Sequence, residues 1–216
     1  MKRVMDVVCA AIGLLLLWPV FLIVAILIKC DSKGPIFFKQ ARVGRQCKPF
    51  MIYKFRTMMA DVTEPAVLLT VEDDRRITRI GRFLRHTKLD ELPQLINVVI
   101  GNMSLVGPRP EVARYVDMFH EEYAEILRLR PGITDLASIR FRNESRLLSN
   151  AADAEAHYIK RILPMKLRLA RVYGRRASLV YDIKLILTTI ASLVCPPRPS
   201  RAPRSLSTEA IPRRMR

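Results

Sequence analysis

The feature that most constrains this chain is an uninterrupted apolar segment near its N-terminus. Val7 to Ile28 runs for 22 residues without a charged side chain. At about 1.5 Å per residue, a helix of this length crosses the roughly 30 Å hydrocarbon core of a bilayer. The run is too long for the apolar region of a cleaved signal peptide, and Lys29-Cys30-Asp31 is not a small-residue cleavage site. We therefore predict a membrane-embedded helix that stays in the protein.

Two topologies fit this segment. Pro19 lies in its middle, where proline removes a backbone hydrogen bond and kinks a helix. Both flanks are basic, with Lys2 and Arg3 before the run and Lys29 and Lys33 among the residues after it. Short basic flanks favour the cytoplasmic side of a membrane. A segment that enters the membrane, bends at Pro19 and returns satisfies both flanks, and a simple span satisfies one. The residues alone leave both topologies open.

The charge of the chain indicates the chemistry of its partners. It has 37 Lys and Arg against 20 Asp and Glu, a net charge of +17. Nucleic acid, anionic lipid and phosphorylated small molecules are the polyanions that such a chain attracts. The four cysteines form no C-x-x-C pair, so we expect neither a disulfide framework nor a zinc site. A reducing cytosol is the natural environment for the soluble part.

The residues after the apolar segment predict one small, mainly helical α+β domain. Ile36 to Gln40 and Phe50 to Phe55 are aromatic and branched, with Gly44 between them, which predicts a short β-hairpin. We predict helices over 79–86, 92–100, 111–130, 151–173 and 178–194. The last of these is short for a span and suits a core helix or an amphipathic helix at a membrane interface.

Composition divides the chain into three parts. We place the membrane helix at 1–30, the soluble domain at 31–195 and a basic tail at 196–216. The tail contains five prolines and six arginines, with Glu209 as its one acidic residue. That composition predicts disorder and an attraction to anionic lipid.

The chemistry of the chain concentrates in arginine-bearing turns and one acidic pair. There is no G-x-x-x-x-G-K-[ST] loop, no G-x-G-x-x-G and no H-E-x-x-H. Asp90 and Glu91 are adjacent, just before Pro93. One interpretation is a helix cap, with Asp90 as the capping residue. The alternative is catalysis, because a carboxylate can hold Mg²⁺ or attack phosphorus as a nucleophile.

Three long motifs resemble the bacterial sugar transferase family. They are GPIFFKQARVGRQCKPFMIYKFRTM, RITRIGRFLRHTKLDELPQLINVVIGNMSLVGPRP and RPGIT, in the family's order. These monotopic polyprenyl-phosphate phosphoglycosyl transferases initiate exopolysaccharide, O-antigen and glycoprotein glycan assembly. The likeness runs from about residue 2 to about residue 190. It implies a re-entrant membrane helix with its kink at Pro19, and a cytoplasmic catalytic domain at the bacterial inner membrane.

The resemblance also implies roles for individual residues. Asp90 matches the nucleophile, and Glu91 matches the neighbouring ligand of an essential Mg²⁺. Arg109 and Arg142 match arginines that bind the substrate's phosphates, and Arg85 matches a basic residue beside the acidic pair. Lys54 and Arg56 belong to a matching motif, but structural roles for them stay open.

Two departures from the family pattern concern specificity and the membrane kink. After RPGIT the family commonly has a glycine, and this chain has Asp135. This difference leaves the recognition of the sugar or nucleotide open. Trp18 also replaces the small residue that commonly precedes the kink proline.

The expected function is transfer of a sugar 1-phosphate from a UDP-sugar to polyprenyl phosphate, with release of UMP. The expected partners are these two substrates and anionic membrane lipids, without nucleic acid; the oligomeric state stays open. Two alternatives remain: a nucleic-acid-binding membrane protein, motivated by the +17 charge, and a non-catalytic scaffold anchored by the same helix. The sequence does not name the sugar.

Overall fold

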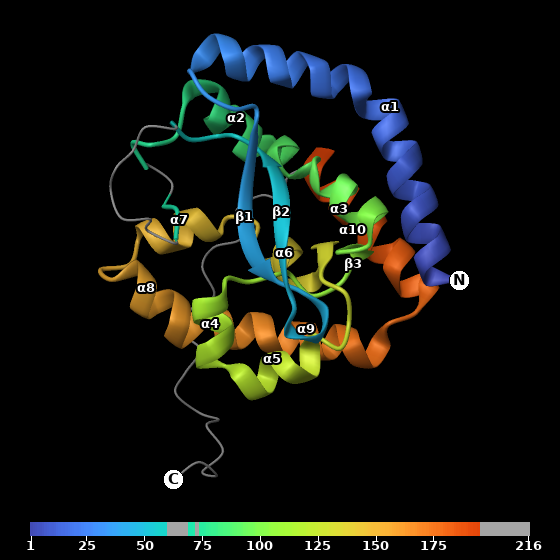
Figure 1. The fold of residues 1–216 in the computed structure, drawn as a ribbon. Helices are drawn as coiled ribbons and strands as arrows, with labels where there is room; N and C mark the ends of the chain where they lie inside the picture. The colour runs from blue at the N-terminus through green and yellow to red at the C-terminus, as the bar shows by residue number, and fades with distance from the viewer. Residues whose placement is uncertain (60–68, 72–73, 195–216) are drawn as a thin grey trace.

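A computed structural model describes residues 1–59, 69–71 and 74–194. The predicted basic tail lies outside the described residues, as does Cys195. Within the described part the chain is mainly helical with little β-structure, as predicted (Figure 1). The two sheets found there have two strands each, with β1 paired to β2 and β3 paired to β4.

The apolar segment forms one long helix, α1 (Lys2–Asp31), with Pro19 inside it. Figure 1 shows this helix as a bent rod along the edge of the molecule. Its outer face exposes large apolar side chains, namely Val4, Val8, Ile12, Leu15, Leu16, Trp18, Leu22, Ile23 and Ile26. Its inner face buries Ala10, Val24 and Ile28 against the rest of the protein. In the part of the chain that the structure describes, it is the one helix long and apolar enough to cross a membrane.

Polar contacts attach both ends of α1 to the rest of the protein. At the N-terminal end, Lys2 forms an ion pair with the buried Asp182, and Asp6 accepts a hydrogen bond from the Ser104 hydroxyl at 2.7 Å. At the other end, Asp31 accepts a hydrogen bond from the backbone N–H of Ile80 at 3.0 Å. The helix therefore lies along the protein with both ends anchored to it.

The predicted hairpin is present. Strand β1 (Phe37–Val43) pairs antiparallel with β2 (Pro49–Phe55), in a register that sets Phe37 opposite Phe55 and Val43 opposite Pro49. The turn between them contains the short helix η1 (Arg45–Cys47). The predicted basic helix is α2 (Arg79–Thr87), which begins where the Thr78 hydroxyl accepts a hydrogen bond from Gly81 N at 2.9 Å.

The interpretation of Asp90 as a helix cap is wrong. Asp90 lies in a short 3₁₀ helix, η2 (Leu89–Glu91), and helix α3 (Gln94–Ile100) begins only after Pro93, without a side-chain cap. An N-cap side chain accepts from the N–H two or three positions on. Here the third position is Pro93, which has no N–H, and the N–H of Leu92 already donates to the Leu89 carbonyl. Asp90 is thereby left without a capping partner.

The prediction of one helix over 111–130 is also wrong. The structure has two short helices, α4 (Ala113–Met118) and α5 (His120–Ile126), separated at Phe119, where φ is −128°. Glu111 lies outside both helices because its carbonyl accepts from the N–H of Val43 in β1, at 2.8 Å. Tyr115 on α4 and Tyr123 on α5 are both buried in one apolar cluster.

Strand β3 (Ser104–Val106) pairs in parallel with β4 (Gly132–Thr134), a pairing that the sequence analysis did not predict. It sets Gly107 against Gly132. A Cβ added to Gly132 would lie 2.0 Å from the backbone nitrogen of Gly107, so only glycine fits there. This close approach holds the Gly107-to-Pro110 turn against the Arg130-Pro131-Gly132 turn.

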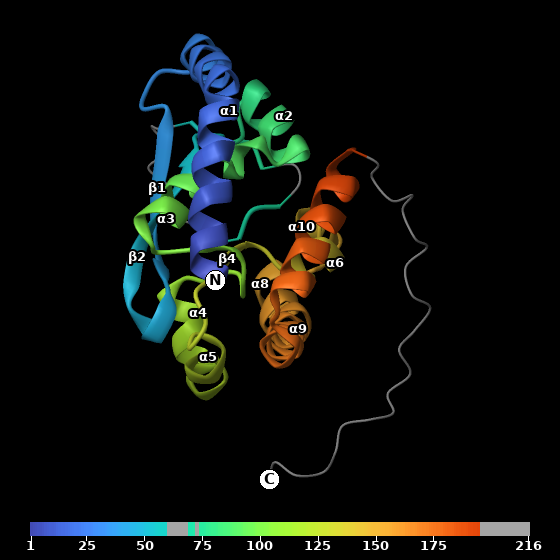
Figure 2. The ribbon, with the colours of Figure 1, turned by 90° about the vertical axis from the view of Figure 1, so that its right-hand side faces the viewer.

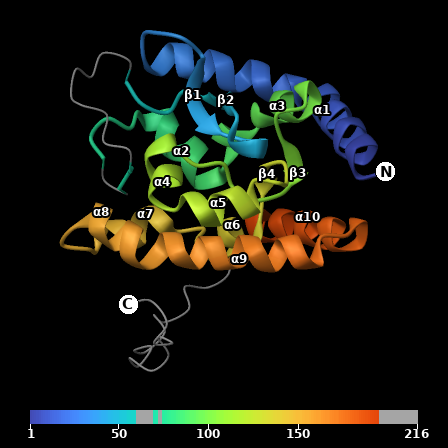
Figure 3. The same cartoon turned by 60° about the horizontal axis from the view of Figure 1, so that its bottom comes forward.

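The remaining elements, α6 to α10, follow β4 in the chain. Helix α9 (Leu163–Arg176) lies on the side of the protein away from α1, and α10 (Leu179–Val194) reaches the N-terminal end of α1 through the Lys2–Asp182 ion pair (Figures 2 and 3). Helix α10 is the predicted C-terminal helix, and it buries Asp182 and Leu185 while exposing Val180, Ile183 and Leu187. In chain order these elements are α6 (Leu136–Arg140), α7 (Glu144–Ser149), α8 (Ala154–His157), the π-helical turn η3 (Tyr158–Ile162), α9 (Leu163–Arg176) and α10 (Leu179–Val194).

The close approach of Gly107 and Gly132 gives a stability prediction. Gly132→Ala forces the two backbones apart and is expected to lower the free energy of unfolding by about 1–3 kcal/mol. Gly174→Ala is the matched control, because its Cβ would meet only Leu129 Cδ1 at 3.6 Å, inside helix α9. That substitution is expected to raise stability by roughly 0.5–1 kcal/mol. Denaturant unfolding in detergent measures both, and equal effects would contradict the packing argument.

Candidate active site

The acidic pair lies at the junction of α2 and α3, where the two carboxylates have different environments. Asp90 is buried, with 7% of its surface exposed. Its Oδ1 atom has no hydrogen-bond partner among the described residues. Burial raises the pKa of Asp90, and the charge of Lys54 opposes that rise. Oδ1 of Asp90 is thus a buried acceptor that the surrounding side chains of the described residues leave unsatisfied.

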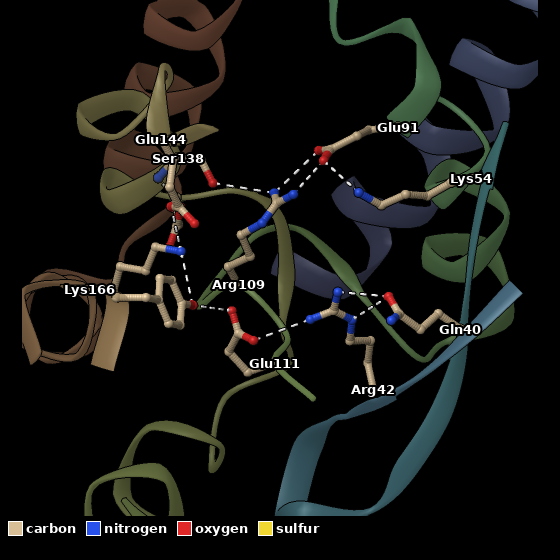
Figure 4. A network of polar contacts seen from close by, with 11 residues as sticks. Gln40, Arg42, Lys54, Glu91, Arg109, Glu111, Ser138, Glu144 and Lys166 are labelled. Carbon is tan, nitrogen blue, oxygen red and sulfur yellow. Dashed lines mark hydrogen bonds and ion pairs between the residues drawn. The ribbon is translucent and has the colours of Figure 1, made fainter. Parts of the chain in front are cut away.

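Glu91 is held between two cations, as Figure 4 shows. Lys54 Nζ lies 2.9 Å from Oε1 of Glu91. Arg109 meets both oxygens of the same carboxylate, with Nη1 at 3.2 Å from Oε2 and Nη2 in contact with Oε1. Burial alone would raise the pKa of Glu91, but Arg109 and Lys54 outweigh it and hold the pKa well below its usual range. Glu91 is therefore ionised at neutral pH.

Arg85 also belongs to this cluster. Its Nε donates to the Thr57 hydroxyl at 2.9 Å. Burial lowers the pKa of Arg85, and the charge of Asp90 opposes that effect most strongly. The guanidinium remains charged, because its ordinary pKa lies far above neutrality. The structure thus brings Asp90, Glu91, Arg85 and Arg109 together.

Among the described residues, Arg142 forms no hydrogen bond or ion pair with these four residues. It follows helix α6, whose Ser138 hydroxyl lies 3.5 Å from Nη1 of Arg109. In the part of the chain that the structure describes, Nη1 of Arg142 is buried and without a hydrogen-bond partner. A buried guanidinium nitrogen without a partner is free to bind an anionic group.

Lys54 and Arg56, whose roles the sequence left open, make different contacts in the structure. Lys54 reaches Glu91 from strand β2. Arg56 instead donates to the backbone carbonyls of Ser32 and Lys33, each at 2.7 Å, and so fixes the chain just after α1. Lys54 and Glu91 are 37 positions apart, so no local sequence pattern could have indicated their contact.

Lys88 is a further basic neighbour of the acidic pair. It adopts a left-handed backbone conformation, with φ of 61°, between α2 and η2. Burial lowers its pKa, and the charge of Glu91 opposes that effect. The acidic pair is therefore surrounded by basic groups from β2, α2 and the Arg109 turn.

A second polar network supports the Arg109 turn from behind (Figure 4). Glu111 accepts a hydrogen bond from the Tyr158 hydroxyl at 2.7 Å and pairs with Arg42 Nη1 at 3.2 Å. Lys166 donates to the Tyr158 oxygen at 3.2 Å and pairs with Glu144 at 2.6 Å. Glu111 lies two residues after Arg109 and Glu144 two residues after Arg142. The network therefore links the segments that carry both arginines.

The carboxylates of this site fit a magnesium ion only if a substrate supplies further ligands. Among the described residues, no group of three or more His, Cys, Asp and Glu side chains could hold a metal. Mg²⁺ is commonly held by one or two carboxylates, with phosphates and waters completing its six ligands. The ionised Glu91 supplies one such carboxylate, and a substrate's phosphates would have to supply further ligands.

Sequence comparisons agree with the geometry of the site. A family profile described as bacterial sugar transferase matches residues 1–196. An exopolysaccharide production protein of Rhizobium leguminosarum bv. phaseoli is 41% identical over 199 residues, which cover 89% of this chain and 94% of that protein. A UDP-glucose:undecaprenyl-phosphate glucose-1-phosphate transferase of Caulobacter vibrioides is 40% identical over 198 residues, covering 89% of this chain and 69% of that protein.

Other relatives are longer than this chain. The Escherichia coli K12 protein named UDP-glucose:undecaprenyl-phosphate glucose-1-phosphate transferase is 36% identical over 194 residues. The match covers 88% of this chain but 39% of that protein. The chain thus spans about two fifths of the length of such relatives.

The Glu111 network gives a pH-dependent prediction. Burial alone would raise the pKa of Glu111, but Arg42 and Lys166 outweigh it and the pKa lies below its usual value. A carboxyl with a lowered pKa stabilises the fold above its unfolded pKa, about 4.3, and loses that contribution as the pH falls. Glu111→Gln is therefore expected to lower the free energy of unfolding by about 1–3 kcal/mol at pH 7. The difference from wild type should shrink below about pH 4.3.

Unfolding midpoints measured from pH 7 down to about pH 2.5, well below the unfolded pKa of glutamate, test this prediction. Glu125→Gln is the control, because Glu125 pairs with Arg171 at 2.9 Å on the exposed surface. Exposed ion pairs contribute about 0–1 kcal/mol. A Glu111→Gln effect that stays constant across this pH range would contradict the assignment.

Proposed function

The chain belongs to the bacterial sugar transferase family, and from this membership we propose that it transfers a sugar 1-phosphate from a UDP-sugar to a polyprenyl phosphate such as undecaprenyl phosphate. UMP is the second product. Relatives whose names state this reaction for glucose or N-acetylgalactosamine support the proposal. The reaction is the first membrane step in assembling an exopolysaccharide or related glycan.

One observation carries the proposal. Asp90 is buried, and its Oδ1 has no hydrogen-bond partner among the described residues. The next residue, Glu91, is ionised and forms ion pairs with Arg109 and Lys54. Opposite charges gathered in a partly buried site act more strongly than they do in water. This arrangement suits a nucleotide diphosphate, whose charge arginines spread and whose phosphorus a carboxylate attacks.

In the first half-reaction Asp90 is the nucleophile. One carboxylate oxygen forms a bond to the sugar-linked phosphorus, and the bond from that phosphorus to the bridging oxygen breaks. UMP leaves with the bridging oxygen and its electron pair. Arg109 and Arg142 bind the phosphate oxygens, and Arg85 balances charge beside Asp90. A phosphosugar-aspartyl intermediate remains on the protein.

In the second half-reaction a phosphate oxygen of the polyprenyl substrate attacks the same phosphorus. The bond to Asp90 breaks, the carboxylate is regenerated, and the diphosphate-linked sugar leaves. Each step exchanges one phosphorus–oxygen bond for another, so no oxidant or reductant is needed. Two separate half-reactions give ping-pong kinetics.

Magnesium belongs to this proposal. Glu91 would hold Mg²⁺ together with the diphosphate. When bound, the ion neutralises charge on the phosphate oxygens. Lys54 and Arg109 pair with Glu91 in this structure, so both cations lie where the substrate's phosphates would meet the ion.

We place the protein at the cytoplasmic face of the inner membrane, with α1 as a re-entrant helix. Support comes from its apolar outer face and from the anchoring of both its ends to one protein body. A span would carry the two ends to opposite sides of a roughly 30 Å core. The exposed apolar face of α10 suits an interfacial position, and the basic charge suits anionic lipid headgroups.

The two alternative functions receive less support from the site. The cations nearest the acidic pair face carboxylates in a buried cluster instead of forming an exposed basic stripe, as a nucleic-acid surface would. A scaffold protein gives no reason for a buried carboxyl oxygen without a partner. The sugar remains open, and a panel of UDP-sugars assayed for UMP release identifies it.

Asp90→Asn tests the chemistry of the proposed site. An amide cannot form the phosphoryl bond, so the variant is expected to lose product formation and the labelled covalent species, at least about 1,000-fold. The assay follows UMP release and protein-bound label from a radiolabelled UDP-sugar with Mg²⁺, and a chelator should stop both signals. Asp117→Asn, on the exposed side of α4, is the control and should behave as wild type. Turnover retained by Asp90→Asn would refute the mechanism.

The membrane topology is tested by protease protection. Peptide tags are placed before Met1 and after Arg216, and inside-out membrane vesicles are treated with protease. A re-entrant α1 exposes both tags on the same side, so both are digested in inside-out vesicles and both are protected in spheroplasts. Digestion of one tag in each preparation would show a span instead.

A further inference from the structure

Two buried amide side chains on helix α3, Gln94 and Asn97, differ in their hydrogen bonding. They lie one turn apart, with 1% and 0% of their surfaces exposed. Residues three apart on a helix share a face. Both side chains therefore face the interior, and their contacts can be compared directly.

Asn97 is bonded at both ends of its amide. Its Oδ1 accepts from the N–H of Tyr53 at 3.0 Å, and its Nδ2 donates to the carbonyl of Met51 at 2.8 Å. Both partners lie on strand β2, so Asn97 fastens α3 to the hairpin. Its role is structural.

The amide nitrogen of Gln94, in contrast, has no hydrogen-bond acceptor in the described part of the chain. This nitrogen, Nε2, is buried. An unsatisfied buried donor costs about 1–3 kcal/mol, and most buried polar groups have partners. Removing this donor would therefore break no hydrogen bond at Nε2. The N–H groups of the amide are available to an acceptor that this arrangement of side chains does not bring to them.

The complementary unsatisfied atom lies four residues earlier. Oδ1 of Asp90 is a buried acceptor without a partner, and Nε2 of Gln94 is a buried donor without one. The backbone between them is helical throughout, because Leu92 and Pro93 both have right-handed helical angles. Successive N–H groups here donate three residues back, as those of Leu92 and Leu95 do. A run wound this tightly makes one turn in about three residues, so Asp90 and Gln94 are separated by little more than one turn of it.

We propose that Gln94 is a positioning residue for the transfer reaction, whose side-chain amide donates a hydrogen bond to the Asp90 carboxyl oxygen that does not bond to phosphorus. The proposal rests on the function assigned above, in which Asp90 is the nucleophile. The bond forms when the substrate settles the rotamers of both side chains.

This hydrogen bond has a defined use in each half-reaction. Before attack it fixes one carboxylate oxygen, so that the other oxygen faces the phosphorus. In the intermediate the fixed oxygen is the carbonyl oxygen of the acyl phosphate and still accepts the bond. When the polyprenyl phosphate displaces Asp90, negative charge returns to the carboxylate, and a donor already in place stabilises that charge.

Gln94→Met tests the proposal, because methionine keeps the length of the side chain and removes the donor. We expect kcat and the single-turnover rate of labelled intermediate formation to fall roughly 10- to 100-fold, the scale of a small misplacement of a reacting group. KM for the UDP-sugar should be unchanged, and the unfolding midpoint should be unchanged or raised. Gln94→Glu should also slow the reaction, because an ionised carboxylate cannot donate.

Asn97→Leu is the matched control. It breaks two hydrogen bonds to β2 and should lower the unfolding midpoint. A Gln94→Met variant that is destabilised or unfolded in the same way would overturn the proposal in favour of a structural role. A raised KM with unchanged kcat would overturn it in favour of substrate binding, and unchanged kinetics would overturn it outright. If Asp90→Asn is inactive while Gln94→Met is normal, the proposed function stands and only this inference fails.

Discussion

The ion pair between Glu91 and Arg109, extended by Lys54, is the interaction on which the site depends. It joins three segments that are distant in the sequence: strand β2, the short 3₁₀ helix after α2, and the turn after β3. A buried charge without a partner costs several kcal/mol, so each member of this trio requires the others. The low pKa of Glu91 follows from the same contacts. Asp90, its neighbour in the chain, feels the same cations, but its Oδ1 has no hydrogen-bond partner among the described residues, and this difference gives the two adjacent carboxylates different chemistry.

The support for Arg109 extends well behind the site. The Gly107–Gly132 contact fixes the start of the turn, and Glu111 fixes its end through Arg42 and Tyr158. Lys166 and Glu144 continue the network to the segment that bears Arg142. The two arginines proposed to bind phosphate are thus positioned by one connected set of buried contacts. Such a set is rigid, because a shift of any member would leave a charge or a donor unsatisfied.

Local patterns in the sequence predicted several elements, and the family resemblance singled out the acidic pair. The long apolar helix, the hairpin, α2 and α10 follow from periodicity and turn residues that are visible in the chain. The failures have particular causes. Pro93 lacks the N–H that Asp90 would cap, and Glu111 pairs with Val43 across the fold, so the helix predicted from residue 111 starts later and breaks at Phe119. Both causes concern backbone hydrogen bonds, which side-chain periodicity does not report.

The sequence by itself determined that a 22-residue uncharged segment precedes a basic domain, and which family the motifs resemble. It could do so because hydropathy and motif spacing are properties of consecutive residues. Only the tertiary structure decided that Lys54 contacts Glu91, that Arg56 fixes the end of α1, and that Gln94 and Asp90 each keep an unsatisfied atom. These facts depend on burial and on contacts between residues as many as 37 positions apart, which appear only when the chain is folded.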